Sequence, residues 1–295
     1  MKPTLTIGIP AYNEEKNIGS LIRAILAEPI VTAQLKEIIV VSDASIDRTD
    51  AIVREIKDRR VRLIRNETRR GNGGSQEAIM AETKTDILVL LDADILPVPG
   101  SIDLLIAPLI ADKHIGLVSG RIIPAGPRTF VERVLAEMHL FKNRLFLSLP
   151  RQNVYLCFGP ARAFSKEFYS VFTYIDNCPT DALSYFAVLK AGLGFAYAHE
   201  ARFIFRCPST LGDHAKQSLR FAASRQSLEQ IFGKAEVDEA YRLPLKTLLP
   251  ALAQELLIHP VLLVSYAAMN QAIRWRYEPS RYSSRWEMAA TSKQL

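Results

Sequence analysis

Short apolar runs alternate with helical patterns up to about residue 120 of the chain. Five of the runs are short and rich in Ile, Val and Leu, which is typical of buried strands. They cover Leu5–Ile9, Ile38–Val41, Val61–Ile64, Ile87–Leu91 and Ile115–Ser119. The stretches between them have helical spacing and cover Glu14–Ala27, Arg48–Lys57, Gly74–Thr83 and Ser101–Ile110. The alternation predicts an α/β fold with a mainly parallel sheet flanked by helices.

The middle of the chain, from about residue 128 to 215, has a less regular pattern. Apolar residues recur at helical spacing from Val131 to Leu149, which predicts an amphipathic helix packed on the sheet. The other elements expected here are an extended run at Val154–Phe158, a helix at Ala182–Ala191, and strands at Phe195–Tyr197 and Phe203–Phe205.

The last part of the chain is apolar and helical in pattern. Leu256–Ile273 holds eighteen residues without a formal charge and is interrupted by Pro260. This length is at the short end for crossing a bilayer, while the Trp, Tyr and Arg that follow suit a membrane interface. The alternative is a helical hairpin packed on the domain and broken at Pro250 and Pro260. We expect a domain at residues 1–230 and a helical region at residues 231–295 that docks on a membrane rather than spanning it.

Composition and charge narrow the class of protein only a little. The 295 residues are 48% hydrophobic and 23% charged, which suits a large globular domain with an appendage. A net charge of +6 favours an anionic partner, such as a nucleotide or an acidic membrane surface. The basic residues form no platform interleaved with aromatic side chains, so we expect no binding of nucleic acid. The three cysteines have no disulfide or metal-ligand spacing and no signal-peptide pattern is present, so we expect a location at the cytoplasmic face of the membrane.

The loops that follow the strands are the most informative about function, because ligands of such sheets bind at the carboxyl ends of the strands. The first loop holds Tyr12 and Glu14, an aromatic and an acidic side chain that can hold a nucleobase and its ribose. In the second loop, Asp43 can accept a hydrogen bond from a base or a hydroxyl, whereas Ser45 has the alternative role of a helix cap. The third loop, Arg69–Gly74, precedes a helix expected to start near Ser75, and is an anion cradle or a flexible basic turn rather than a P-loop.

The fourth loop carries the strongest chemical signal. The apolar strand Ile87–Leu91 delivers two carboxylates, Asp92 and Asp94, at its carboxyl end. Two close carboxylates repel each other unless a cation or a proton neutralises them. Carboxylate oxygens suit Mg²⁺ or Mn²⁺, which would bridge the diphosphate of a nucleotide. A helix cap after Pro97 is the alternative role for one Asp, but it does not explain both.

These loops, in this order after successive strands, resemble glycosyltransferase family two, whose members have the GT-A fold. The resemblance rests on Pro10 to Glu14, Ser42 to Asp47 and Asp92 to Asp94, and it extends over roughly residues 1–230. It implies a nucleoside diphosphate sugar donor and a bound Mg²⁺ or Mn²⁺. The nucleotide-binding residues implied are Pro10, Ala11, Tyr12, Glu14, Asp43, Ser45, Asn72, Gly73, Asp92 and Ala93, and the metal ligands are Asp94 and Asp92. The chain departs from the family pattern in Ser42, where Asp is usual, and in Asn72, where Lys is usual.

Three later segments extend the resemblance. Gly159 and Arg162 match the segment that lines the acceptor site, and Asp181 matches the catalytic base, with Thr180 replacing the usual Glu. Asp176 is the fallback base, and an N-cap is the alternative role of Asp181. Gln217 and Arg220 match a Gln-x-x-Arg-Trp signature with Phe221 in place of Trp, and would contact the acceptor or the diphosphate.

The resulting expectation is a transferase that moves a sugar, with inversion, to a saccharide or lipid-linked acceptor in cell-envelope or polysaccharide biosynthesis. A sugar-phosphate nucleotidylyltransferase is the first alternative, although Pro10 to Asn13 stands where its glycine-rich loop belongs. The second alternative is a non-catalytic protein that binds nucleotide sugars.

Overall fold

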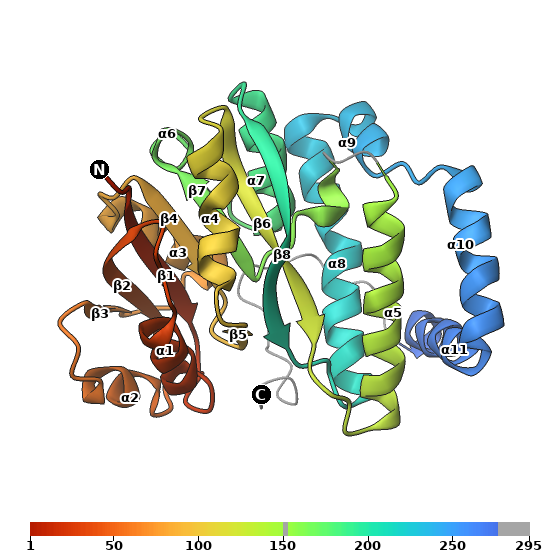
Figure 1. Cartoon of the computed structure of the whole chain (residues 1–295). Coiled ribbons are helices and arrows are strands. Elements are labelled where there is room, and N and C mark those ends of the chain that lie inside the picture. The colour runs from red at the N-terminus through yellow and green to blue at the C-terminus, as the bar shows by residue number, and fades with distance from the viewer. Residues whose placement is uncertain (150–152, 277–295) are drawn as a thin grey trace.

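The structure is a computed structural model that describes residues 1–149 and 153–276, without the side chains of residues 219–224. Its centre is a sheet in which the described strands follow the order β3-β2-β1-β4-β7-β6-β8-β5 (Figure 1). The strands are β1 (Thr4–Ala11), β2 (Gln34–Asp43), β3 (Val61–Asn66), β4 (Ile87–Leu91), β5 (Ile95–Pro97), β6 (Ile115–Pro124), β7 (Ala161–Ser165) and β8 (Gly194–Phe205).

Strand direction places many carboxyl ends at one edge of the sheet. Strands β1 to β4 pair in parallel, whereas β7 runs antiparallel to both β4 and β6. Strand β6 therefore has the direction of β4, and β8 pairs with β6 in parallel. The carboxyl ends of β1, β2, β4, β6 and β8 thus share an edge, at which β7 begins.

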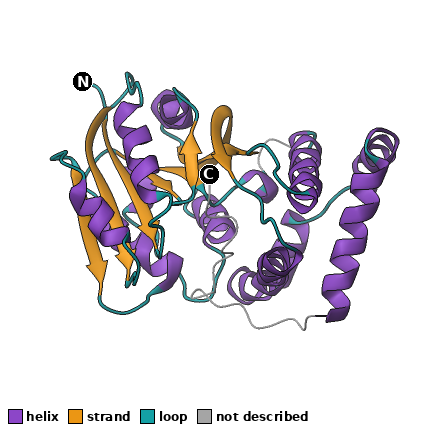
Figure 2. Ribbon diagram, turned by 90° about the horizontal axis from the view of Figure 1, so that it is seen from below, coloured by secondary structure: helices purple, strands orange, loops and turns teal. Residues whose placement is uncertain are grey.

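Helices cover both faces of the sheet (Figures 1 and 2). They are α1 (Ile18–Ala27), α2 (Thr49–Glu55), α3 (Gly71–Glu82), α4 (Ser101–Ala111), α5 (Phe130–Leu147), the 3-10 helix η1 (Val154–Leu156), α6 (Lys166–Tyr169), α7 (Thr180–Lys190), α8 (Leu211–Phe232), α9 (Lys234–Ala240), α10 (Leu245–Ile258) and α11 (Pro260–Arg276). Because side chains of a strand alternate between faces, Ile38 and Val40 of β2 belong to the apolar cluster that includes α1 and α4, while Ile39 and Val41 belong to the cluster that includes α3 and α7. Two apolar clusters, one on each face, stabilise this arrangement.

The α/β class and the strands expected up to residue 120 are confirmed, but several details were wrong. Val154–Phe158 is not extended, because its first three residues form η1. The two short strands expected after residue 195 are one continuous strand, β8, while β5 and β7 were not expected at all. Helix α3 starts at Gly71 rather than near Ser75, and Pro250 lies inside α10 instead of breaking it.

The C-terminal helices lie at the outer margin of the molecule, next to α5 and α8 (Figure 1). Helices α10 and α11 meet at an angle of 115° across a break at His259. Tyr266 and Met269 of α11 pack against Leu135 and Ala136 of α5. The expected domain boundary at residue 230 falls in the last turn of α8, and this boundary stays a prediction.

Candidate active site

The loops after β1 and β2 are fastened to each other at the shared edge. The backbone N–H of Asn13 donates to Ser45 Oγ (3.1 Å), and Asn13 Oδ1 accepts from the backbone N–H of Ile46 (2.9 Å). The N–H of Glu14 donates to Thr49 Oγ1 at 2.7 Å. Neither Asn13 nor Ser45 caps a helix, since the N-cap residues of α1 and α2 are Asn17 and Arg48. The two side chains instead fix the relative position of two predicted nucleotide-binding loops.

Tyr12 and Glu14 occupy different environments within the first loop. Glu14 is buried, and its Oε2 accepts from Asn17 Nδ2 at 3.1 Å. Tyr12 is half-buried, and the guanidinium of Arg69 stacks over its ring, 3.8 Å from the ring centroid. This cation–π contact joins the first loop to the third. Pro10 and Ala11 are buried at the end of β1, so the sheet fixes the backbone from which the first loop starts.

Asp43 caps the third helix of the domain. Its Oδ1 accepts from Asn66 Nδ2 (2.9 Å) and from the N–H of Arg70 (2.8 Å), and its Oδ2 accepts from the N–H of Gly71 (2.8 Å). A carboxylate at a helix N-terminus is favoured by the exposed N–H groups and the helix dipole. A carboxylate accepts about four hydrogen bonds, so Oδ2 of Asp43 retains capacity for one more.

The glycines of the third loop form the first turn of α3 rather than a loop before it. Gly71 has a φ of 80°, which glycine adopts without strain. Gly73 lies beside the start of α7, because a Cβ at this position would be 3.7 Å from Thr180 Cγ2. Asn72 Oδ1 accepts from Gln76 Nε2 at 3.1 Å, so Asn72 is held by the next turn of its own helix.

Asp92 and Asp94 follow directly after β4, whose five residues are all buried. Both Asp residues are half-buried, whereas Ala93 between them is buried. The N–H of Asp92 donates to the carbonyl of Pro160 (2.8 Å), so this turn is joined to the start of β7. The N-cap of α4 is Gly100, without a side-chain capping bond, so capping of that helix does not account for either Asp.

Arg162 is the largest fully buried side chain of the described residues, and it connects three elements. Its Nη2 donates to Gln76 Oε1 of α3 (2.8 Å), and its Nη1 donates to Thr180 O (2.7 Å) and Ser184 Oγ (2.9 Å) of α7. Its Nε donates to Gly159 O at 3.1 Å. These four acceptors are all groups of the protein, so the expected acceptor contact of Arg162 stays a prediction.

The charge of Arg162 lies among ionisable groups of the candidate site. Burial acts to lower the pKa of Arg162, but the nearby Tyr174, Cys157, Asp181 and Asp92 outweigh it, and the pKa of Arg162 is raised. Asp92, in the turn after β4, and Asp181, in α7, therefore act on the same buried guanidinium. Gln76 was missed by the sequence reasoning, although it lies three residues before the buried Ile79, on the buried face of α3.

Asp181 is the second residue of α7 and does not cap it, because the N-cap is Pro179. It is half-buried, and its Oδ1 accepts from the N–H of Ala182 at 2.8 Å. Gly159 lies next to it, since a Cβ on this glycine would be 3.7 Å from Asp181 Oδ2. The fallback base Asp176 is exposed and lines a pocket of about 260 Å³ beside α3, together with Arg70, Gly74, Glu77 and Tyr174.

The residues of α8 are less closely tied to this edge. Gln217 is half-buried, and the side chain of Arg220 lies outside the described part of the chain, so both roles stay predictions. His214 of α8 is buried, with its ring 6.2 Å from that of Tyr266 of α11. Burial is the main cause that lowers its pKa.

Comparison of the sequence with known protein families identifies the family of this chain. The sequence profile "Glycosyl transferase family 2" matches residues 6–172, more than half of the chain. The chain belongs to this family. Its curated relatives include the succinoglycan biosynthesis protein ExoO of Rhizobium meliloti, 38% identical over 92 residues, which are 31% of this chain and 26% of that protein. The glucosyl-3-phosphoglycerate synthase of Mycobacterium tuberculosis is 32% identical over 120 residues, 39% of this chain and 36% of that enzyme. The chain thus matches about a quarter to a third of the length of these relatives.

Solved structures show the same fold. The mannosyltransferase PcManGT of Pyrobaculum calidifontis, in complex with GDP-Man and Mn²⁺, superposes with a TM-score of 0.60 and 19% identity, over 94% of this chain and 77% of that one. The M. tuberculosis synthase, in complex with Mn²⁺, UDP and phosphoglyceric acid, gives a TM-score of 0.52 and 21% identity, over 76% of this chain and 78% of that one. These similarities confirm the predicted GT-A fold.

Proposed function

We propose that this protein transfers a sugar, with inversion, from a nucleoside diphosphate sugar to a saccharide or lipid-linked acceptor, with the help of Mg²⁺ or Mn²⁺. The observation that carries the proposal is the position of Asp92 and Asp94 at the end of β4, in a family 2 chain. The same sheet edge holds the fastened first and second loops and the first turn of α3. This arrangement favours a nucleotide as the ligand of the edge.

Asp92 and Asp94 fit a divalent metal ion. They offer hard carboxylate oxygens one residue apart, half-exposed, on a turn that is joined to β7 through the N–H of Asp92. When bound, such an ion neutralises charge that develops on a departing diphosphate. The mannosyltransferase and the synthase were both solved with Mn²⁺, which supports this assignment.

The nucleoside is assigned to the first and second loops. The stacked pair of Tyr12 and Arg69 offers a planar surface for a base, and Glu14 and Asp43 offer carboxylate acceptors for base or ribose hydrogens. The diphosphate is assigned to the N-terminal turn of α3, where Asn72 and Gly73 present backbone N–H groups along the helix dipole.

Asp181 is assigned as the base of the transfer. Its carboxylate takes the proton of the acceptor hydroxyl as the hydroxyl oxygen forms a bond to the anomeric carbon and the bond from that carbon to the diphosphate breaks. Support comes from its half-buried position and from the adjacent Gly159, which leaves space beside the carboxylate. Asp92 lies near the same Arg162, which favours a donor and a base on one side of the sheet.

The acceptor and the location are the least constrained parts of the proposal. The relative ExoO is named for the biosynthesis of succinoglycan, a polysaccharide, and this supports a saccharide as the acceptor. We assign the protein to the cytoplasmic face of a membrane, with the C-terminal region as the contact.

The test is transfer from radiolabelled nucleotide sugars in the presence and absence of Mn²⁺, preceded by a thermal-shift screen over nucleoside diphosphates. Asp94→Ala should abolish the Mn²⁺-dependent part of both the transfer and the nucleotide-induced stabilisation. Glu167→Ala, an exposed acid on α6, is the matched control and should leave both unchanged. Undiminished transfer by Asp94→Ala would refute the metal assignment, and release of pyrophosphate from a nucleoside triphosphate would favour the nucleotidylyltransferase instead.

A further inference from the structure

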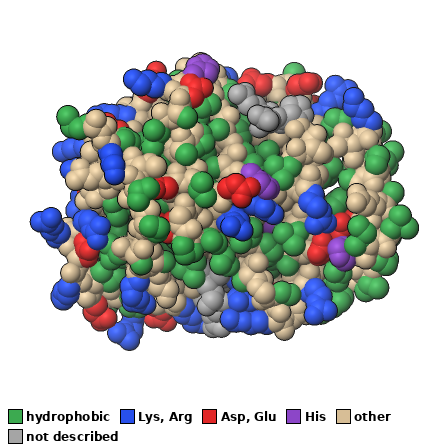
Figure 3. All heavy atoms as spheres, viewed as in Figure 1, with side chains coloured by type: hydrophobic (Ala, Val, Ile, Leu, Met, Phe, Trp, Pro, Cys, Tyr) green, Lys and Arg blue, Asp and Glu red, His purple; other side chains and the backbone are tan. Residues whose placement is uncertain are grey.

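The C-terminal helices expose large apolar side chains on their outer surface. We call these residues the hairpin face: Leu245, Leu249, Leu256, Leu257 and Ile258 of α10, and Val261, Val264 and Trp275 of α11. Their exposed fractions run from 48% for Leu256 to 84% for Leu257. Green side chains are also visible at the margin of Figure 3 where Figure 1 places α10. So many exposed apolar residues on adjoining helices are typical of an interaction surface.

The one acid in this part of the chain is turned away from the hairpin face. Between Thr247 and Ile273 the sequence contains no Lys, Arg or Asp and a single Glu, Glu255, which is only 3% exposed. Glu255 Oε2 accepts from Arg144 Nη2 of α5 at 2.7 Å. The outer surface of this stretch therefore carries no formal charge.

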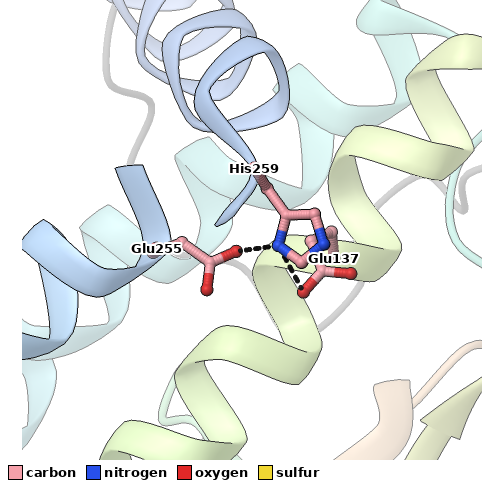
Figure 4. A group of neighbouring side chains, drawn as sticks. All are labelled: Glu137, Glu255 and His259. Carbon is pink, nitrogen blue, oxygen red and sulfur yellow. Dashed lines mark hydrogen bonds and ion pairs between the residues drawn. The ribbon is translucent and has the colours of Figure 1, made fainter. Parts of the chain in front are cut away.

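At the bend between the two helices, Glu255 and His259 meet Glu137 of α5 (Figure 4). Nδ1 of His259 lies 3.0 Å from Glu255 Oε1 and 3.5 Å from Glu137 Oε1. Ligand atoms of these three residues lie within 4.8 Å of one another, which satisfies the spacing of a metal site. However, Arg144 donates to both carboxylates, at 3.1 Å to Glu137 and 2.7 Å to Glu255, and already supplies the positive charge that a metal would bring. We interpret the group as an ionic clamp between α5 and the bend.

Basic residues flank the hairpin face at both ends. Lys246 is exposed at the start of α10, and Arg274 and Arg276 are exposed at the end of α11, on either side of Trp275. No exposed acid lies between Leu245 and Arg276. An apolar surface with a basic rim and an exposed Trp matches the anionic headgroups and the adjoining acyl chains of a bilayer.

A second copy of the chain fits this surface less well. In a two-fold symmetric contact the same patch meets itself, so Lys246, Arg274 and Arg276 would approach their own copies without an exposed acid in the segment to pair with. A bilayer of anionic lipids has the opposite charge.

The helices are too short to cross the bilayer individually. Helix α10 has 14 residues and α11 has 17, which at 1.5 Å per residue gives about 21 and about 26 Å, against a hydrocarbon core of about 30 Å. No single helix in the described ranges is long and apolar enough to span, and the pair meets that requirement only together and with its 115° bend. The clamp and the packing of Tyr266 on α5 also hold the pair against the globular domain.

We propose that the hairpin face lies in the headgroup region of an anionic bilayer, with α10 and α11 docked parallel to the surface and not inserted across it. This inference rests on the proposed membrane association and adds the surface that docks and the class of lipid that it binds. The clamp of Glu137, Arg144, Glu255 and His259 holds the face outward and keeps Glu255 from the lipid.

The test is flotation of the full chain with vesicles of phosphatidylcholine alone or mixed with phosphatidylglycerol. The wild type should float with the mixed vesicles, and Leu257→Asp should weaken this binding roughly tenfold. The matched control is Val171→Asp, which places the same charge at another exposed apolar residue, 70% exposed and outside the hairpin face. The triple variant K246Q/R274Q/R276Q should bind mixed vesicles about fivefold more weakly for each charge removed. Added salt should also weaken the binding of the wild type to these vesicles.

The outcomes separate this inference from the proposed function. Nucleotide-dependent thermal stabilisation should be equal in wild type and Leu257→Asp, because the hairpin face is not part of the candidate site. Absence of flotation of the wild type, or equal flotation of wild type and Leu257→Asp, would overturn the docking surface even if transfer is observed. A wild-type dimer that Leu257→Asp dissociates, without vesicle binding, would overturn it in favour of a second copy.

Discussion

Replacement of Arg162 by Met is the most informative change in the candidate site. The guanidinium is fully buried and donates to Gln76, Thr180, Ser184 and Gly159, so it holds α3, α7 and the start of β7 together. Met has a similar length and no donors, so it fills much of the space but satisfies none of these acceptors.

The magnitude follows from the acceptors that lose a donor. All four acceptors lose their donor, and two of them, Gln76 Oε1 and Ser184 Oγ, belong to fully buried residues. At roughly 1–3 kcal/mol for each unsatisfied buried group, the loss is about 2–6 kcal/mol. Removal of a buried charge offsets part of it, so we expect a net destabilisation of about 3 kcal/mol. For a chain of this size that corresponds to a decrease in Tm of roughly 6–12 °C.

The assay is thermal unfolding with and without a nucleoside diphosphate and Mn²⁺, and the control is Arg202→Met at an exposed position of β8. Arg162→Met should lower the Tm, whereas the increment in Tm caused by the nucleotide should persist, because every described donor of Arg162 is directed at protein. A Tm equal to that of Arg202→Met would refute the structural role. A normal Tm increment in Arg202→Met that disappears in Arg162→Met would show instead that Arg162 contacts the ligand.

Three further predictions concern single groups. Asp181→Asn should reduce transfer by roughly 10²–10⁴ while the nucleotide-dependent Tm increment stays unchanged; a variant with normal transfer would exclude Asp181 as the base. Burial acts to raise the pKa of Glu132, but the backbone N–H groups of Arg128 and Thr129 and the side chain of Arg206 outweigh it, so the pKa is lowered from 4.5. Glu132 therefore contributes stability above pH 4.5 that is lost as the pH falls below this value. Glu132→Gln should weaken the dependence of the free energy of unfolding on pH below 4.5, and an unchanged dependence would contradict this. Burial raises the pKa of Cys157, Cys178 and Cys207 to about 12, so a thiol reagent should label the native protein only as it unfolds, and rapid labelling of any thiol at neutral pH would contradict their burial.

The parts of the fold that were predicted are those whose signal is local. Strand β4 consists of five consecutive buried apolar residues, and its bounds were predicted without error. Strand β7 was missed because its second residue is Arg162, and an arginine in a short segment does not indicate a buried strand. Its burial depends on Gln76 and Ser184, which are far away in the sequence and supply the acceptors. Strand β8 was predicted as two strands because the charged residues near Glu200 interrupt its apolar pattern. In the structure, the register of β8 with β6 shifts at the same place, between Gly120 and Arg121 of β6.

The candidate site shows the same division between local and distant signals. The order of the loops after successive strands was sufficient to indicate the family, which the profile over residues 6–172 confirms. The individual roles of the polar side chains were not accessible, because they depend on which loop lies opposite. Asn13 and Ser45 bond to each other's loops, although a helix cap was the alternative role of Ser45 in the sequence. The stacking of Arg69 on Tyr12 likewise joins two loops that are separated by more than fifty residues.

The hydrogen bonds of the carboxylates distinguish Asp43, which has a structural role, from Asp92, Asp94 and Asp181. Asp43 accepts two hydrogen bonds at the start of α3 and a third from Asn66 of β3, so much of its capacity is used by the fold. Its replacement would disturb the helix as well as any ligand. Asp92 and Asp94 do not cap α4, whose N-cap is Gly100, and Asp181 lies inside the first turn of α7, where its Oδ1 accepts one N–H, that of Ala182. Arg162 stabilises the ionised form of the nearby Asp92 and Asp181, and none of the three carboxylates holds a helix terminus in the way that Asp43 does. For these three residues a functional role is therefore the better explanation, and their variants should lose activity at a smaller loss of stability than a variant of Asp43.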